Sequence, residues 1–197
     1  MEPEKSHSRV VRLRTARLLT NALNPFFIFT ALYALVALQG PNAVPAVLYV
    51  GVELAAAAFV AGYVFLLRRR RRVGDFWISA RRQRLAPAFV LLGAFVVLLG
   101  VLALLGAPGD LLETTLSMGL ASATVAATTF VWKASAHAAV AGHAAPAGLL
   151  VLGLPGLVFV LVLPAVLWSR VESGAHTPAQ VLAGAGIGAV FAAAFLL

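Results

Sequence analysis

Apolar runs separated by short polar segments make up the chain from residue 24 to its end. A helix that crosses a bilayer needs roughly 20 predominantly apolar residues. The runs therefore predict seven helices. They cover residues 24–38, 44–67, 88–105, 112–132, 136–152, 156–168 and 178–197. The fifth and sixth are short and meet at a Gly-Leu-Pro-Gly turn, so they could form a hairpin that does not fully cross, which would leave five true spans.

Composition places the chain among integral membrane proteins. Hydrophobic residues make up 61% of it and charged residues 11%, against about 25% charged residues in a typical soluble domain. We expect an all-α, polytopic transmembrane helix bundle of about six to seven helices. Residues 24–197 would form its single domain, and residues 1–23 a basic segment on the membrane surface. The absence of cysteine excludes disulfides and thiolate chemistry.

The distribution of charge predicts the orientation. If the spans alternate in direction, every Lys and Arg falls on one side, whereas the loops of the other side hold Asp110. By the positive-inside rule, the N-terminus and the basic segments are then cytoplasmic, in a multi-pass protein of the cell membrane. The net charge of +8 is better explained by anionic lipid than by nucleic acid, so lipid is the expected partner.

Three polar segments lie at predicted helix boundaries on this basic side. They span residues 74–84, 132–137 and 168–178, and together supply Arg, Lys, two His and a few carboxylates. Phosphoryl transfer needs such groups: cations for the phosphate oxygens, a nucleophile, and an acid for the leaving group. Each also has a simpler explanation, because arginines anchor topology, Lys133 can extend from a helix end, and a single His can serve packing.

Other polar and small residues lie inside the predicted helices. Ionisable groups within a membrane, here His143 and Glu53, are candidates for function. We favour a buried hydrogen bond between them that fixes helix packing. Gly184 and Gly188 form a GxxxG pair, which favours the close approach of another helix.

The polar segments resemble the type 2 phosphatidic acid phosphatase superfamily. Its third motif is Ser-Arg, five residues, His, three residues, Asp; Ser169, Arg170 and His176 match it, and Gln180 replaces the Asp. Its second motif, Pro-Ser-Gly-His, is reduced to the Ser and His of residues 134–137. Its first motif, Lys, six residues, Arg-Pro, is absent as written, although residues 75–84 stand in its place. The resemblance covers roughly residues 74–197 and is that of a divergent bacterial branch.

The resemblance implies a metal-independent lipid phosphatase that needs no cofactor. His176 would attack phosphorus to form a phosphohistidine, and His137 would protonate the leaving alcohol. The phosphate oxygens would be bound by Arg170, Lys133, Arg84, Arg81, Ser135 and Ser169. Gln180, Asp75 and Glu172 are candidates to orient the nucleophile. A Gln carbonyl can accept one hydrogen bond from His176 but brings no charge to stabilise an imidazolium.

The implied substrate is a polyprenyl phosphate or diphosphate, or a lipid of the phosphatidic acid type. Two other functions fit the same residues. One is the binding or transport of anionic lipids without catalysis. The other is a phosphotransferase, in which the same pocket passes the phosphate to an acceptor other than water.

Overall fold

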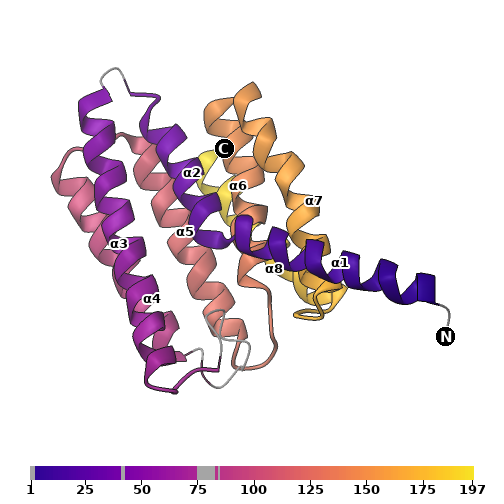
Figure 1. Cartoon of the computed structure of the whole chain (residues 1–197). Coiled ribbons are helices and arrows are strands. Elements are labelled where there is room, and N and C mark those ends of the chain that lie inside the picture. The colour runs from indigo at the N-terminus through magenta and orange to yellow at the C-terminus, as the bar shows by residue number, and fades with distance from the viewer. Residues whose placement is uncertain (1–2, 41–42, 75–82, 84) are drawn as a thin grey trace.

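The structure is a computed structural model that describes residues 3–40, 43–74, 83 and 85–197. These residues form eight α-helices and no strand (Figure 1). The helices are α1 (Pro3–Ala22), α2 (Pro25–Ala37), α3 (Ala43–Arg69), α4 (Leu85–Leu104), α5 (Gly109–Thr128), α6 (Ala136–Leu152), α7 (Leu157–Glu172) and α8 (Pro178–Leu196). A short 3₁₀ helix, η2 (Leu154–Gly156), joins α6 to α7.

The seven predicted helices correspond in order to α2 through α8, but fewer of them qualify as independent spans. Four of the described helices are long and apolar enough to cross a membrane on their own: α3, α4, α7 together with η2, and α8. Helix α2 has only 13 residues and reaches spanning length when joined to α1 across a 44° bend. The expectation of seven spans is thus corrected to four or five among the described residues. Helix α6, at 17 residues or about 25 Å, is shorter than a typical span.

Helix α5 is less apolar than its neighbours because it lies inside the bundle. It packs against α2, α4, α6 and α8. Three of its polar residues, Thr114, Thr115 and Ser117, are buried in those contacts. The side chains of Thr115 and Ser117 donate hydrogen bonds to carbonyl oxygens of their own helix. Protein rather than lipid covers this buried face of the helix, so polar side chains are tolerated along it.

The basic N-terminal segment is an α-helix that packs against α7. Thr20 Oγ1 donates to Ser169 Oγ at 3.3 Å, and the Arg12 guanidinium lies 2.6 Å from the carboxylate of Glu172. Arg12 is 62% exposed, so this ion pair contributes little stability by itself. The chain bends between α1 and α2 where Asn24 caps the new helix and Pro25 occupies its first turn.

Helices α6 and α8 pack with their backbones in close contact. A Cβ atom added to Gly188 would collide with the carbonyl oxygen of Ala139, and one added to Gly184 would collide with that of Ser135. On the facing helix, Gly142 lies equally close to the backbone of Ala185. The prediction that the GxxxG pair packs against another helix is confirmed, and the partner is α6.

The prediction of a hydrogen bond between His143 and Glu53 is wrong. His143 Nε2 lies 2.8 Å from Ser117 Oγ, which links α6 to α5. Both carboxylate oxygens of Glu53 lie 3.0 Å from Thr30 Oγ1, which links α3 to α2. Each residue does fix helix packing, but with a different neighbour, because α3 packs mainly on α2 and α4.

Candidate functional site

The turn between α7 and α8 explains the spacing of the Arg170–His176 motif. The backbone N–H of Ala175 donates to the Arg170 carbonyl at 3.2 Å, and that of Gly174 donates to Val171 at 2.9 Å. Together with the positive φ of 69° at Gly174, this is a Schellman cap. The N–H of His176 also donates to the Arg170 carbonyl at 3.2 Å. The helix end therefore folds the chain back so that His176 lies beside Arg170.

Helix α8 begins directly after this turn and is capped by its own residues. Thr177 Oγ1 accepts from the N–H of Gln180 at 3.3 Å, and Gln180 Oε1 accepts from the N–H of Thr177 at 3.1 Å. This is a capping box. Gln180, which we expected to orient His176, thus uses its side-chain oxygen to fix the start of α8.

The start of α6 is attached to the same turn. The N–H of Ser135 donates to the backbone carbonyl of Gln180 at 3.2 Å, and Ser135 Oγ caps α6 by accepting from the N–H of Ala138 at 3.3 Å. Two residues later, His137 is 5% exposed. The backbone bond and the tight packing at Gly184 hold the first turn of α6, and with it His137, against the turn that carries His176.

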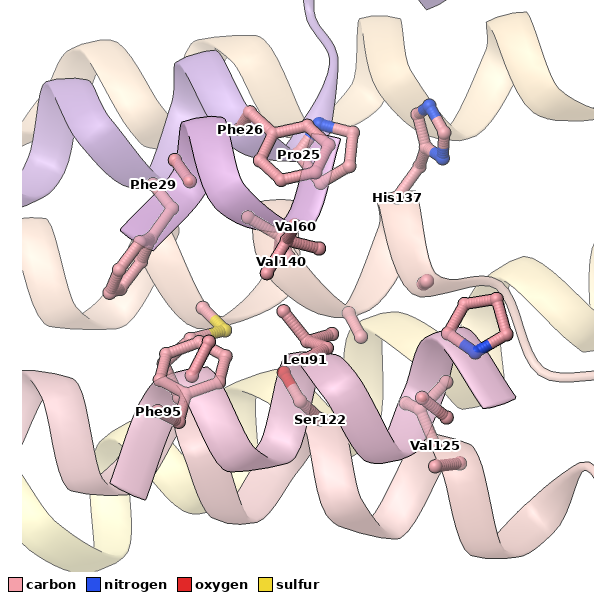
Figure 2. Close-up of a pocket in the computed structure, with 18 of the residues that line it drawn as sticks. Pro25, Phe26, Phe29, Val60, Leu91, Phe95, Ser122, Val125, His137 and Val140 are labelled. Carbon is pink, nitrogen blue, oxygen red and sulfur yellow. The ribbon is translucent and has the colours of Figure 1, made fainter. Parts of the chain in front are cut away.

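A cavity of about 260 Å³ connects these residues. Its wall comes from α2, α3, α4, α5 and α6, and His137, Arg170 and His176 line one part of it. Figure 2 shows His137 at one end and the rings of Phe29 and Phe95 at the other. Apart from Glu53, Ser122 and Thr129, the remaining described lining residues are apolar. We call His137, Arg170 and His176 the polar end of the cavity.

Three of the other predicted phosphate ligands, Lys133, Ser135 and Ser169, lie around the polar end and are not part of the described wall. Lys133 Nζ donates to the carbonyl oxygen of Ala175 at 2.9 Å, which ties the segment before α6 to the turn before His176. Ser169 is 1% exposed and faces α1, where it accepts from Thr20 and donates to the Val166 carbonyl at 2.9 Å. Ser135 is fully buried as the α6 cap.

Two of the three candidates for the partner of His176 are engaged by other residues in the structure. The carboxylate of Glu172 faces α1 and pairs with Arg12. The Gln180 amide completes the capping box. Asp75 lies outside the described residues, as do Arg81 and Arg84. Asp75 thus stays a prediction for this role, and the two arginines stay predictions as phosphate ligands.

The apolar wall of the cavity was not predicted as part of a site. Phe29 and Phe95 belong to helices that are apolar almost throughout, so no sequence signal separates a residue that lines a cavity from one that faces lipid. The role of Gln180 did have a signal, since Thr-Pro-Ala-Gln fits the capping-box pattern. Among the described residues, no group of three or more His, Asp or Glu could hold a metal ion.

Comparison with known proteins adds no neighbour to this description. No protein-family model, curated protein or solved structure matches the chain. The fold and the site define a multi-helix membrane protein with a largely apolar cavity that ends in two histidines and an arginine.

Proposed function

We propose that this protein is a membrane-embedded phosphatase that acts on a lipid phosphate, as the resemblance of its motifs implies. One observation carries the proposal: His137, Arg170 and His176 line the same cavity, whose other walls are mostly apolar. A charged arginine and two histidines are costly to place beside an apolar membrane cavity, and such residues usually have a polar task. A molecule with an anionic head and a hydrocarbon tail matches both parts of this cavity.

The polar end has the groups for a two-step hydrolysis. In the first step, a neutral ring nitrogen of His176 attacks phosphorus, the bond from phosphorus to the lipid oxygen breaks, and His137 gives a proton to the leaving alcohol. In the second step, water attacks the phosphohistidine, His137 takes the proton from that water, and the phosphorus–nitrogen bond breaks to release inorganic phosphate. Arg170 stabilises the charge on the phosphate oxygens in both steps.

The direct test is phosphate release by the purified protein in lipid nanodiscs, with polyprenyl phosphates, polyprenyl diphosphates and phosphatidic acid as substrates. We expect release by the wild type and its loss in His176→Ala. The matched control is His143→Gln, because His143 is buried in the bundle and bonded to Ser117, away from the polar end. Equal release by wild type and His176→Ala would refute the assignment.

The role of His137 is tested by varying the leaving group. His137→Ala should slow release of a poor leaving group such as an aliphatic alcohol far more than release of a nitrophenolate from a matched phosphate ester. General acid catalysis contributes roughly 10²–10⁴-fold where a proton must be supplied, and little where it need not be. A similar loss with both leaving groups would show that His137 does not act as the acid.

Lipid binding without turnover is the alternative, and one observation favours it. Glu172, the described carboxylate among the candidates to orient His176, pairs with Arg12 of α1, and a Gln180 amide carries no charge to support an imidazolium. In that case Arg170→Ala would weaken binding of a lipid phosphate, His176→Ala would leave it nearly unchanged, and no phosphate would be released. A phosphotransferase would instead release phosphate only with an acceptor alcohol present.

We also propose that the polar end opens toward the cytoplasm. Helix α3 ends in the basic run that begins at Arg68, α6 begins three residues after Lys133, and α7 ends two residues after Arg170. Figure 1 shows these three helix ends at the same end of the bundle. The chain has no cysteine, so a Ser173→Cys variant has a single reactive thiol next to the α7–α8 turn. A membrane-impermeant thiol reagent should label it only after cells are opened, and labelling of intact cells would overturn this orientation.

A further inference from the structure

The cavity has a defined depth, which can be measured along the helices that line it. Its lining residues on α3 run from Val64, near the basic end of the helix, to Glu53. Those on α4 run from Pro87 to Leu98. Each interval is eleven residues, or about 16 Å at the α-helical rise. This is close to half of the roughly 30 Å hydrocarbon core, so the cavity extends about one leaflet into the membrane.

Two aromatic rings stand near the deep end. Phe29 of α2 and Phe95 of α4 meet edge to face, with ring centroids 5.7 Å apart. Figure 2 shows both at the end of the cavity opposite His137. Phe95 is supported from behind by α5, where a Cβ atom at Gly119 would lie only 3.4 Å from its side chain. Phe29 is 7% exposed and is held within the core, where it also contacts Tyr33. The pair is therefore packed from both sides.

The volume of the cavity limits what can enter it. At about 260 Å³ it lies just below the range of roughly 300–1,000 Å³ that is typical of ligand pockets. A space this small and about 16 Å deep suits one hydrocarbon chain better than two chains side by side, since non-bonded carbon atoms stay about 3.5–4.0 Å apart. Apart from Glu53, Ser122 and Thr129, the wall between the deep end and the polar end gives such a chain only apolar contacts.

We propose that the protein selects a lipid phosphate with a single chain, and that the Phe29–Phe95 pair sets the longest tail the cavity accepts. The inference rests on the proposed function for the position of the phosphate at the polar end. The tail then lies along α3, α4 and α5, and its end meets the two rings. A longer tail has to bend or leave some methylenes outside the cavity, where they contact lipid instead of the wall and add no affinity.

The test uses two variants that change the depth in opposite directions. Phe95→Ala removes the ring and lengthens the cavity. Ser122→Leu adds a side chain to its middle, where Figure 2 places Ser122 between the rings and His137. The control is Phe89→Ala, on the same helix as Phe95 but 71% exposed and not part of the described wall. Protein in nanodiscs is assayed with a series of n-alkyl phosphates for kcat/KM, and with the matching n-alkyl phosphonates, which cannot be hydrolysed, for Kd.

We expect the preferred tail of Phe95→Ala to be longer than that of the wild type, and the ratio of affinities for long over short tails to rise. Ser122→Leu should prefer a shorter tail, and Phe89→Ala should match the wild type. Unchanged length profiles in both cavity variants, or an equal shift in Phe89→Ala, would overturn the inference. If the phosphonate profiles shift as expected but no phosphate is released from any substrate, the inference stands and the proposed function fails. If phosphate is released but neither kcat/KM nor Kd depends on tail length, the proposed function stands and the inference fails.

Tight binding of a two-chain phosphatidic acid would also contradict the inference. The wild type should bind a single-chain lysophosphatidic acid more tightly than the diacyl lipid with the same chain. Phe95→Ala should leave this preference unchanged, since it lengthens the cavity rather than widening its mouth. A stronger affinity for the diacyl lipid in the wild type is the contrary result.

Discussion

Replacing Gly188 by alanine should disrupt the contact between α6 and α8. The added Cβ would collide with the carbonyl oxygen of Ala139 and lie 2.6 Å from the backbone nitrogen of His143. Both atoms belong to the backbone of α6, so neither can move aside by a change of rotamer. Forcing extra volume into a well-packed interface costs about 1–3 kcal/mol, and we expect Gly188→Ala to fall in the upper half of that range.

The chain contains a matched control on the same helix. Gly186 has no heavy atom within 4 Å of the position its Cβ would take. Alanine at a helix-interior glycine otherwise favours the helix by roughly 0.5–1 kcal/mol. Gly186→Ala should therefore be neutral or slightly stabilising, while the same substitution two residues later is destabilising.

The assay is reversible unfolding of the purified protein in mixed detergent micelles, followed by circular dichroism, with phosphate release measured on the same samples. Because α8 holds the first turn of α6 in place, Gly188→Ala should also lower activity under conditions where the protein is still folded. Equal unfolding free energies for the two variants would refute the packing argument. Equal activities, with unequal stabilities, would refute the claim that this contact positions His137.

Three further predictions concern polar side chains near the helix ends and in the core. Lys133→Ala should lower kcat/KM for lipid phosphate because the turn before His176 loses the hydrogen bond from Lys133 to the Ala175 carbonyl. Lys133→Arg should restore part of the lost activity. Unchanged activity in both variants would show that this hydrogen bond is dispensable. His143→Leu should destabilise the fold by about 1 kcal/mol because Ser117 loses a buried hydrogen-bond partner. The same unfolding assay measures this loss, and the activity of the folded fraction should be unchanged. Gln180→Glu should keep both stability and activity because glutamate also completes a capping box with Thr177. Gln180→Ala should lower the free energy of unfolding by about 1 kcal/mol. A loss of activity without a loss of stability in Gln180→Glu would show that Gln180 takes part in catalysis.

Much of the helical architecture could be predicted because membrane helices have a strong local signal. Runs of apolar residues end where polar or helix-breaking residues begin, and α6 occupies the predicted residues 136–152. The local pattern does not predict which helices face lipid and which are packed within the bundle. Helix α5 is long enough to span, but its threonines and serines are accommodated by the helices around it. A helix that is only moderately apolar can therefore lie at the centre of the bundle.

The candidate site was predictable where it depends on local chain geometry. Five residues separate Arg170 from His176, and a helix cap over those residues brings His176 back beside Arg170. Contacts between distant segments were not predictable in the same way. Nothing near Glu172 in the sequence indicates that its partner is Arg12, 160 residues away. The predicted pairing of His143 with Glu53 was wrong for the same reason. The sequence shows that both residues lie within apolar helices, but it does not show which helices are neighbours.

The way the cavity wall is divided among the helices has a consequence for how such a protein can diversify. The histidines and the arginine of the polar end come from α6, α7 and the turn before α8, whereas the deep wall comes from α2 through α5. Helices α6 and α8 interlock through their backbones and tolerate few changes, but residues of the deep wall can be exchanged without altering that contact. Substrate range can then evolve, or be engineered, by remodelling the α3 and α4 hairpin alone. A chimaera that takes these two helices from a homologue should inherit the donor's preference for tail length and keep the recipient's chemistry.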